Sequence, residues 1–275
     1  MKGKRVLVTG ATDGIGKKTA IELSKMGAEL IVHGRDRQKG EQLLEELRPF
    51  TNGISPKYVR ANLASLSAVV KLVSEVNAQF DSLDVLINNA GVFMRGQTFS
   101  NDGYETTFAV NHLAHFSLTL RLLPLLKKAD QGRVVTVSSV AHKNSPRIDF
   151  SDISEINTYI DYSAYALSKL ANVLFSNELA AKLKDTPITS NCLHPGVVST
   201  KLLHAGFGIS GNPAEEGCKT SVYLATDPKL SEVSGKYFSN RQEADASPYA
   251  FDPLIRRNLW SLSEELTGAS FADFV

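Results

Sequence analysis

Short apolar runs alternate with longer segments of helical periodicity along most of this chain. Six of the runs predict strands, at residues 6–9, 30–33, 58–61, 85–88, 134–138 and 189–194. Their near-continuous hydrophobicity and the helix-length intervals between them predict a parallel sheet covered on both faces, because each parallel connection requires a crossover. We therefore expect an α/β fold built on a doubly wound, mostly parallel sheet.

The length and the composition predict a single domain that spans residues 1–275. A chain of 275 residues, 43% of them hydrophobic, can bury one large core. One stretch, residues 199–215, is punctuated by Gly206, Gly208, Gly211 and Pro213 within an otherwise apolar segment. We expect this stretch to be a mobile loop that contacts the substrate.

The charge balance and the cysteine content exclude several classes of function. The chain has 30 Lys and Arg against 29 Asp and Glu, so no net charge draws it to nucleic acid or to an anionic membrane. Cys192 and Cys218 show no CxxC spacing and no nearby ligand cluster, so we expect free thiols and no metal site. The first apolar run is too short for a signal peptide or a membrane span, and we expect a cytoplasmic protein.

A glycine-rich turn follows the first expected strand and opens the first expected helix. In the sequence Thr-Gly-Ala-Thr-Asp-Gly-Ile-Gly, residues 9–16, the glycines permit a tight turn and the close approach of a phosphate to backbone amides. The helix N-terminus adds free N–H groups and a partial positive charge. This placement predicts dinucleotide binding by the turn, at Gly10, Thr12, Asp13, Gly14, Ile15 and Gly16.

Tyr165 and Lys169 are four residues apart in a stretch, residues 163–183, whose composition predicts a helix. Both side chains should project from one face, which places an ammonium group beside a phenol. A neighbouring cation favours the phenolate, so we expect it to lower the pKa of Tyr165 from its ordinary value of about 10. Of the 8 tyrosines, only Tyr165 has a lysine four residues later. The pair predicts acid/base chemistry.

Three further segments lie at or beside expected strand ends, where ligands bind in open α/β sheets. They are Asn-Asn-Ala-Gly at residues 88–91, Asn111, and the serines at 138 and 139. Together with the GxxxGxG spacing of the turn and the Tyr/Lys pair, they resemble the short-chain dehydrogenase/reductase family, which has a Rossmann-like fold. Segments 111–116, 137–142, 169–175 and 233–238 resemble its retinol-dehydrogenase-like branch, and the resemblance covers essentially the whole chain.

The resemblance implies a catalytic role for each residue of this set. Tyr165 would be the acid/base, Lys169 its electrostatic partner and a ribose ligand, and Ser139 the donor to the developing oxyanion. Asn111 would organise a water that relays protons. Ser138 competes with Ser139, but alternation along the strand lets only one of them face the pocket, and the family motif matches the second.

The resemblance also implies cofactor contacts outside the turn. Residues 194–200 resemble the family segment beside the nicotinamide, with Thr200 at the carboxamide, and His194 fits a packed residue better than a catalyst. Asn62 stands where the family usually carries Asp at the adenine, and its amide can both donate and accept. The implied contacts are Arg35, Asn62, Leu63, Asn89, Ala90, Gly91, Pro195, Val198 and Thr200, together with Tyr165 and Lys169.

The end of the second expected strand favours NADP(H) over NAD(H). NAD sites place a carboxylate there for the ribose 2′-hydroxyl, whereas residues 31–37 read Ile-Val-His-Gly-Arg-Asp-Arg. Arg35 resembles the family's 2′-phosphate contact, and a guanidinium group matches phosphate geometry. The adjacent Asp36 should point elsewhere, and Lys17 and Arg37 should add positive charge nearby.

We therefore expect an oxidoreductase that moves a hydride between NADP(H) and a small-molecule alcohol or carbonyl. The segment between Thr200 and Pro213 is shorter than in membrane retinol enzymes, so the specific substrate stays open. The expected lining favours a hydrophobic substrate, with Val92, Phe93, Met94, Val140, Leu202, Leu203, Phe207 and Ile209. Two other functions remain open, a dinucleotide-sensing regulator without turnover and an epimerase or dehydratase using the same Tyr/Lys pair. A homo-oligomer also remains open, and no feature indicates a nucleic acid partner or a membrane span.

Overall fold

The computed structural model describes residues 1–51, 53–146, 148, 150 and 161–275, and within them one sheet organises the chain. Its strand order is β3-β2-β1-β4-β5-β6-β7-β8, parallel throughout except for the antiparallel β7–β8 pair. The reversal of strand order between β1 and β4 is the switch point at which doubly wound sheets open a crevice. The strands are β1 (Arg5–Val8), β2 (Glu29–Gly34), β3 (Lys57–Arg60), β4 (Val85–Asn88), β5 (Arg133–Val137), β6 (Thr189–His194), β7 (Tyr237–Ser239) and β8 (Gln242–Glu243).

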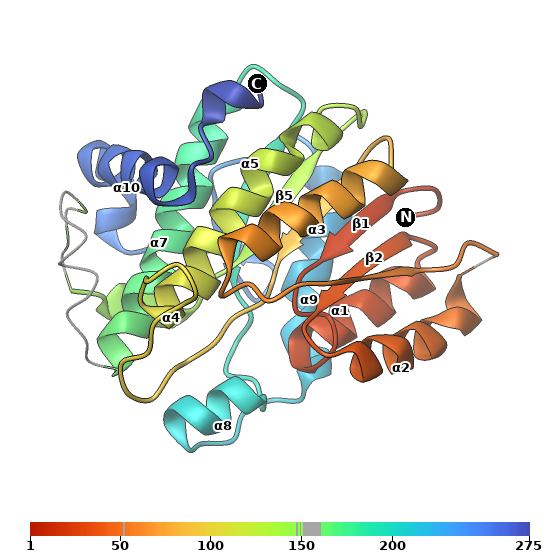
Figure 1. The fold of residues 1–275 in the computed structure, drawn as a ribbon, viewed down its shortest axis with the longest axis horizontal. Coiled ribbons are helices and arrows are strands. Elements are labelled where there is room, and N and C mark those ends of the chain that lie inside the picture. Colours follow the sequence, from red (N-terminus) through yellow and green to blue (C-terminus); the bar gives the residue numbers. More distant parts are fainter. Residues whose placement is uncertain (52, 147, 149, 151–160) are drawn as a thin grey trace.

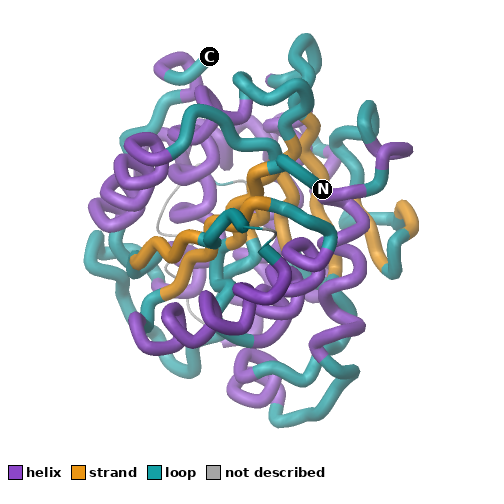
Figure 2. Tube along the Cα trace, turned by 90° about the vertical axis from the view of Figure 1, so that its right-hand side faces the viewer, coloured by secondary structure: helices purple, strands orange, loops and turns teal. Residues whose placement is uncertain are grey.

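Helices cover both faces of this sheet (Figures 1 and 2). One layer contains α1 (Gly14–Lys25), α2 (Arg37–Leu47) and α9 (Ala214–Thr226). The other contains α3 (Leu66–Gln79), α5 (Ala114–Leu126), α7 (Asp161–Lys182) and α10 (Pro253–Thr267), with the short α4 (Thr106–Phe108) leading into α5. The predicted single α/β domain with a Rossmann-like sheet is confirmed.

Alternation along the central strands explains why both faces are covered. In β1, Val6 and Val8 pack in one core with Leu23 of α1, whereas Leu7 packs in the opposite core with Phe116 of α5. Both sides of the strand are fully buried, so the strand reads as a continuous apolar run. The six predicted strands are confirmed, with ends shifted by no more than one residue.

The last two strands of the sheet, β7 and β8, were not predicted from the sequence. Tyr237–Ser239 is three residues long and Gln242–Glu243 is two, so neither contains enough residues to show a period. The positive φ angles of Asn240 and Arg241 make the tight turn between them, although neither residue is glycine.

The stretch 199–215, predicted to be a mobile loop, contains the helix α8 (Lys201–Phe207), so the prediction of a loop is wrong for these residues. Thr200 caps the helix by accepting from the Leu203 N–H at 3.2 Å, and Gly208 ends it with φ +63°. Gly206 is required inside the helix, since a Cβ there would lie 2.7 Å from the Phe93 ring. In Figure 1, α8 stands apart from the helical layers, below the sheet.

Candidate active site

A cavity of about 540 Å³ lies at the carboxyl ends of the parallel strands, where the fold is expected to bind ligands. The chain segments that follow β1 through β6 all contribute to its wall. Of the catalytic and cofactor-binding residues predicted from the sequence, all but Asn111 line this cavity. These are Gly10, Thr12, Asp13, Gly14, Ile15, Gly16, Arg35, Asn62, Leu63, Asn89, Ala90, Gly91, Ser139, Tyr165, Lys169, Pro195, Val198 and Thr200.

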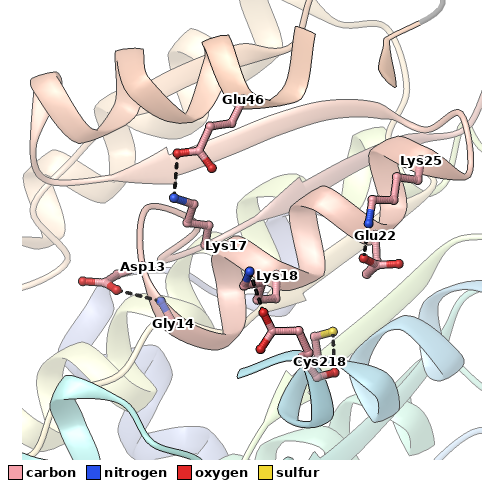
Figure 3. Close-up of polar contacts among 9 residues, drawn as sticks. Asp13, Gly14, Lys17, Lys18, Glu22, Lys25, Glu46 and Cys218 are labelled. Atoms are coloured by element: carbon pink, nitrogen blue, oxygen red, sulfur yellow. Dashed lines mark hydrogen bonds and ion pairs between the residues drawn. The ribbon is translucent and has the colours of Figure 1, made fainter. Parts of the chain in front are cut away.

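The glycine-rich turn forms one wall of the cavity and depends on its glycines. Gly10 and Gly14 have φ angles of +63° and +51°, and a Cβ on Gly10 would lie 2.9 Å from the Cα of Ala90. A Cβ on Gly16 would collide with the carbonyl of Gly10. Asp13 caps α1 by accepting from the Gly14 N–H at 2.8 Å, as Figure 3 shows. The turn therefore leaves the N-terminus of α1 accessible from the cavity, where the first N–H groups of the helix have no partner within it.

Cationic side chains gather where β2 ends. Arg35 is exposed and lines the cavity, and Lys39 from the first turn of α2 lines it as well. The carboxylate of Asp36 accepts from the Lys39 N–H at 3.1 Å and caps α2. Asp36 nevertheless lines the cavity beside Arg35, so the sequence-based expectation that it points elsewhere is wrong; its carboxylate is held by the cap of α2.

The expectation that Lys17 and Arg37 supply further charge to this site is wrong. Lys17 extends toward α2 and pairs with Glu46 at 2.7 Å, as Figure 3 shows. Arg37 pairs with Glu41 at 2.8 Å one helical turn later. Neither residue lines the cavity, because each is drawn to a carboxylate on the outer surface of the helical layer.

Lys201 supplies cationic charge that sequence analysis did not identify. Its Nζ lies 2.5 Å from Oδ2 of Asp13, and Nζ of Lys39 lies 3.8 Å from the same oxygen. The Lys201 contact, first among several causes, keeps the pKa of Asp13 below its ordinary value. Thus Asp13 links the start of α8 to the glycine-rich turn. Lys39 lies in the first turn of the helix that follows Arg35, so its position in the sequence could have identified it, whereas no local pattern marks Lys201.

Tyr165, Lys169 and Ser139 meet at the other end of the cavity. Tyr165 packs against Phe93 and Phe207, with ring centroids 5.4 and 5.9 Å from its own. Lys169 is buried one turn later on α7 and donates to the carbonyl of Val137 at 3.2 Å. The Ser139 hydroxyl is hydrogen-bonded to the Tyr165 phenol and also caps the short helix that follows it.

The neighbouring Ser138 has a different use. It is buried, and its hydroxyl donates to the carbonyl of Lys169 at 2.7 Å, which ties β5 to α7. Alternation along the strand therefore separates the two serines as the sequence predicted, since only the hydroxyl of Ser139 stands beside Tyr165.

The predicted lowering of the Tyr165 pKa by Lys169 is wrong for this state of the protein. Burial raises the pKa of Tyr165 to about 12, and the hydrogen bond from Ser139 only partly opposes the rise. Burial also lowers the pKa of Lys169 to about 8. The ammonium lies 5.7 Å from the centre of the Tyr165 ring and is directed to Val137, so it does not offset the desolvation of the phenol.

Asn111 lies behind the cavity wall in a turn of π-helix, Ala109–Leu113. Its amide donates to the Val92 carbonyl at 3.0 Å and accepts from the Val92 N–H at 2.8 Å. A second donor bond of 3.0 Å reaches the Ser168 hydroxyl on α7. The carboxamide thus joins the segment after β4 to the helix that carries Tyr165 and Lys169, although it does not line the cavity.

The wall around Tyr165 is largely apolar. Of the side chains predicted to line it, six do so: Val92, Val140, Leu202, Leu203, Phe207 and Ile209. Phe93 and Met94 do not line the cavity. Phe93 packs instead among Tyr165, Phe207 and Gly206, where it supports α8. Tyr162, one turn before Tyr165 on α7, is a lining residue that the sequence analysis missed, although its i,i+3 spacing marks the same helix face.

His194 is held in a structural contact, as its position suggested. Its Nδ1 accepts from the Val140 N–H at 3.2 Å, and burial lowers its pKa to about 4. His142 donates through Nδ1 to the Ser139 carbonyl and accepts from the Ser247 N–H through Nε2. Both imidazoles are therefore neutral near pH 7 and fix the backbone on either side of Ser139.

The residues present suit a phosphorylated dinucleotide. The glycine-rich turn leaves no room for a Cβ at Gly10 or Gly16, and it presents the N-terminus of α1 to the cavity. Arg35 and Lys39 lie where β2 and α2 meet, and Ser139, Tyr165 and Lys169 lie at the far end. Within the described part of the chain, no cluster of three or more His, Cys, Asp or Glu side chains is arranged for a metal ion, and both cysteines are free and buried.

The sequence of this chain is similar to those of known proteins. A family profile described as short chain dehydrogenase matches residues 4–207. Human retinol dehydrogenase 14 is 41% identical over 294 residues, covering 98% of this chain and 87% of the relative, and mouse polyprenol dehydrogenase is 36% identical over 288 residues, covering 98% and 86%. Human retinol dehydrogenase 12 is 40% identical over 277 residues, with coverage of 98% and 87%.

Solved structures show the same fold. An uncharacterized protein from Mycobacterium paratuberculosis superposes with a TM-score of 0.82 at 32% identity, covering 98% of this chain and 95% of that one. A short chain dehydrogenase from Escherichia coli CFT073, complexed with NADPH, has a TM-score of 0.73 at 25% identity, with coverage of 88% and 98%. Among the described residues, none of the helices combines the length and hydrophobicity needed to cross a bilayer.

Proposed function

Because this chain belongs to the short-chain dehydrogenase/reductase family, on its retinol-dehydrogenase-like branch, we propose that it transfers a hydride between NADP(H) and a hydrophobic alcohol or carbonyl compound. The observation that carries the proposal is the two-ended cavity. Ser139 and Tyr165 meet within apolar walls at one end, while Arg35 and Lys39 supply positive charge at the other, with the glycine-rich turn also lining the cavity.

The nicotinamide of the bound cofactor would supply or accept the hydride, and the protein must manage the proton. Burial holds Tyr165 fully protonated near pH 7, since its pKa is about 12. In the direction of carbonyl reduction the phenol can therefore donate its proton to the substrate oxygen as it stands. In the direction of alcohol oxidation it must first lose that proton, and positive charge at Lys169 favours the loss.

Ser139 is placed to stabilise the charge that develops on the substrate oxygen. Its hydroxyl already contacts the Tyr165 phenol, so an oxygen that accepts from one can accept from both. Removing one such donor typically costs about 2.7–4 kcal/mol of barrier. The backbone of Ser139 is fixed by His142, which keeps the hydroxyl at one position relative to α7.

The preference for NADP(H) rests on the end of β2. The position that carries an acid in NAD-specific sites carries none here, and Arg35 and Lys39 both line the cavity beside it. A guanidinium group can bind a phosphate through two parallel hydrogen bonds. The NADPH complex of the related Escherichia coli structure supports this choice.

The substrate end favours an apolar ligand that α8 helps to enclose. Leu202, Leu203 and Phe207 all come from α8 and line the cavity. The helix is tied down through Lys201 to Asp13 and through a 2.6 Å bond from Arg95 to the Ala205 carbonyl. We propose that residues 200–212 close over bound substrate and exclude water from the reacting atoms.

The experiment that tests the function is a spectrophotometric screen of aldehydes, ketones and alcohols with NADPH or NADP⁺. We expect carbonyl reduction to consume NADPH in a 1:1 ratio with alcohol formed. Cofactor binding without turnover across the panel would support a dinucleotide-sensing regulator, and conversion of a sugar nucleotide without net change in NADPH would support an epimerase or dehydratase.

A further inference from the structure

A buried histidine behind the active site links two segments on which the site depends. His115, at the start of α5, is 1% exposed and does not line the cavity. Its Nδ1 lies 3.1 Å from the carbonyl oxygen of Asn111, and its Nε2 lies 3.0 Å from the hydroxyl of Thr9. Neither contact is used by the proton chemistry described above.

The hydrogen-bond partners determine where the imidazole proton lies. The Asn111 carbonyl can only accept, so Nδ1 of His115 must donate to it. Burial lowers the pKa of His115 to about 3, so the ring is neutral and Nε2 is an acceptor. The Thr9 hydroxyl lies 3.3 Å from the Ile87 carbonyl and 3.0 Å from Nε2, and its proton satisfies Nε2 in the shorter contact.

The Thr9 hydroxyl is then fully used. Its oxygen accepts from the backbone N–H groups of Asn89 and Ala90, at 2.9 and 3.0 Å, and both of these residues line the cavity. With two acceptor bonds and one donor bond to the imidazole, the hydroxyl reaches the capacity of its type, so the Ile87 carbonyl at 3.3 Å competes for the same proton. The imidazole therefore helps to hold the segment after β4.

The other side of the imidazole acts on the catalytic end. A Cβ added to Gly91 would lie 3.4 Å from both the Asn111 side-chain oxygen and the Lys169 ammonium, so these two groups border the same space. The π-helical turn that carries Asn111 is irregular, and the imidazole bond occupies its carbonyl. A shift of that turn would move Asn111 relative to Lys169.

We propose that His115 is a positioning residue for the hydride transfer proposed above: its imidazole fixes the Asn111 carbonyl through one nitrogen and the Thr9 hydroxyl through the other. The two hydrogen bonds of the imidazole have separate consequences. The Nδ1 bond sets the geometry around Lys169 and so affects kcat. The Nε2 bond sets the cofactor-facing backbone at residues 89–90 and so affects cofactor affinity.

Two substitutions separate the effects of these bonds. In His115→Asn the amide nitrogen can occupy the place of Nδ1, and in His115→Gln the amide can occupy the place of Nε2. We expect His115→Asn to keep kcat and to weaken NADPH binding about tenfold, as a lost buried hydrogen bond would. We expect His115→Gln to keep the NADPH Kd and to lower kcat by about tenfold or more. The Kd is measured from NADPH fluorescence without substrate, and kcat from NADPH absorbance at saturation.

Thr267→Val is the control. Thr267 is buried on α10, its hydroxyl donates to the Ser263 carbonyl at 2.6 Å, and it does not line the cavity. Its replacement should lower Tm without changing kcat or Kd. Nitrogen-15 NMR of histidine-labelled protein should show His115 protonated on Nδ1 alone between pH 6 and 8, which needs no activity.

The outcomes distinguish this proposal from the proposed function. Identical changes in kcat and Kd for the two His115 variants, or a proton on Nε2 in the NMR spectrum, would overturn the positioning role. If the wild-type protein binds NADPH but turns over no substrate, the proposed function fails, while the Kd and NMR measurements still decide whether His115 holds the Thr9 side.

Discussion

Replacement of Arg35 by alanine should remove most of the preference for NADP(H). Arg35 lines the cavity where β2 ends, and the nearby carboxylate of Asp36 is engaged as the cap of α2. A hydrogen bond to a charged group is worth about 1.5–3 kcal/mol, which corresponds to roughly 10–150-fold in affinity. NAD(H) lacks the 2′-phosphate, so its efficiency should change by no more than about threefold on the same scale. Lys39 remains to attract the phosphate, which places the expected loss in the lower part of this range.

The assay is kcat/KM for NADPH and NADH, measured with one substrate on wild type, Arg35→Ala and a matched control. Arg37→Ala is that control, because Arg37 lies two residues later, pairs with Glu41 at 2.8 Å and does not line the cavity. We expect the control to keep the wild-type ratio. Equal efficiency with both cofactors in the wild type, or an unchanged ratio in Arg35→Ala, would refute the assignment.

Three further predictions follow from the geometry. Amide hydrogen exchange of residues 200–212 should be slower in the ternary complex than in the free protein, and equally high protection in both states would exclude closure. Gly16→Ala should abolish NADPH binding, because the added Cβ would push against the Gly10 carbonyl. Binding is measured by NADPH fluorescence, and circular dichroism should show that the variant remains folded. An unchanged Kd would show that the turn tolerates the substitution. The free energy of unfolding, from urea titrations, should fall as the pH decreases from about 6.5 toward 4, because burial lowers the pKa of His33 to about 4 and the unfolded chain binds that proton first. This group alone contributes about 3 kcal/mol above pH 6.5, and a flat profile across that window would contradict the burial argument.

The parts of the site that sequence analysis located depend on short-range chemistry. The glycine-rich turn and the Tyr165–Lys169 pair follow from backbone freedom and helical spacing, both of which act within a few residues. Strand alternation likewise separates Ser138 from Ser139, and the structure places the hydroxyl of Ser139 beside the phenol. Local spacing therefore identifies the residues of the site, but it does not predict their ion pairs or their pKa values.

The features that sequence analysis missed depend on distant segments. Asp13 and Lys201 are 188 residues apart, so no local pattern could predict the contact that joins α8 to the glycine-rich turn. The helical signal in α8 is hidden by Gly206 within it and Gly208 just after it, and Gly206 is there to fit Phe93. The pKa of Tyr165 departs from its predicted direction because burial, a tertiary property, outweighs a lysine that is turned toward Val137.

The central claim is that Tyr165 transfers the proton, and Tyr165→Phe tests it most directly. The substitution removes only the hydroxyl, and the ring should still pack against Phe93 and Phe207. General acid/base groups contribute typically about 10²- to 10⁴-fold, so we predict a fall of that size in kcat/KM with an unchanged NADPH Kd. A purified variant that binds NADPH normally and retains more than roughly a tenth of wild-type kcat/KM would contradict the account.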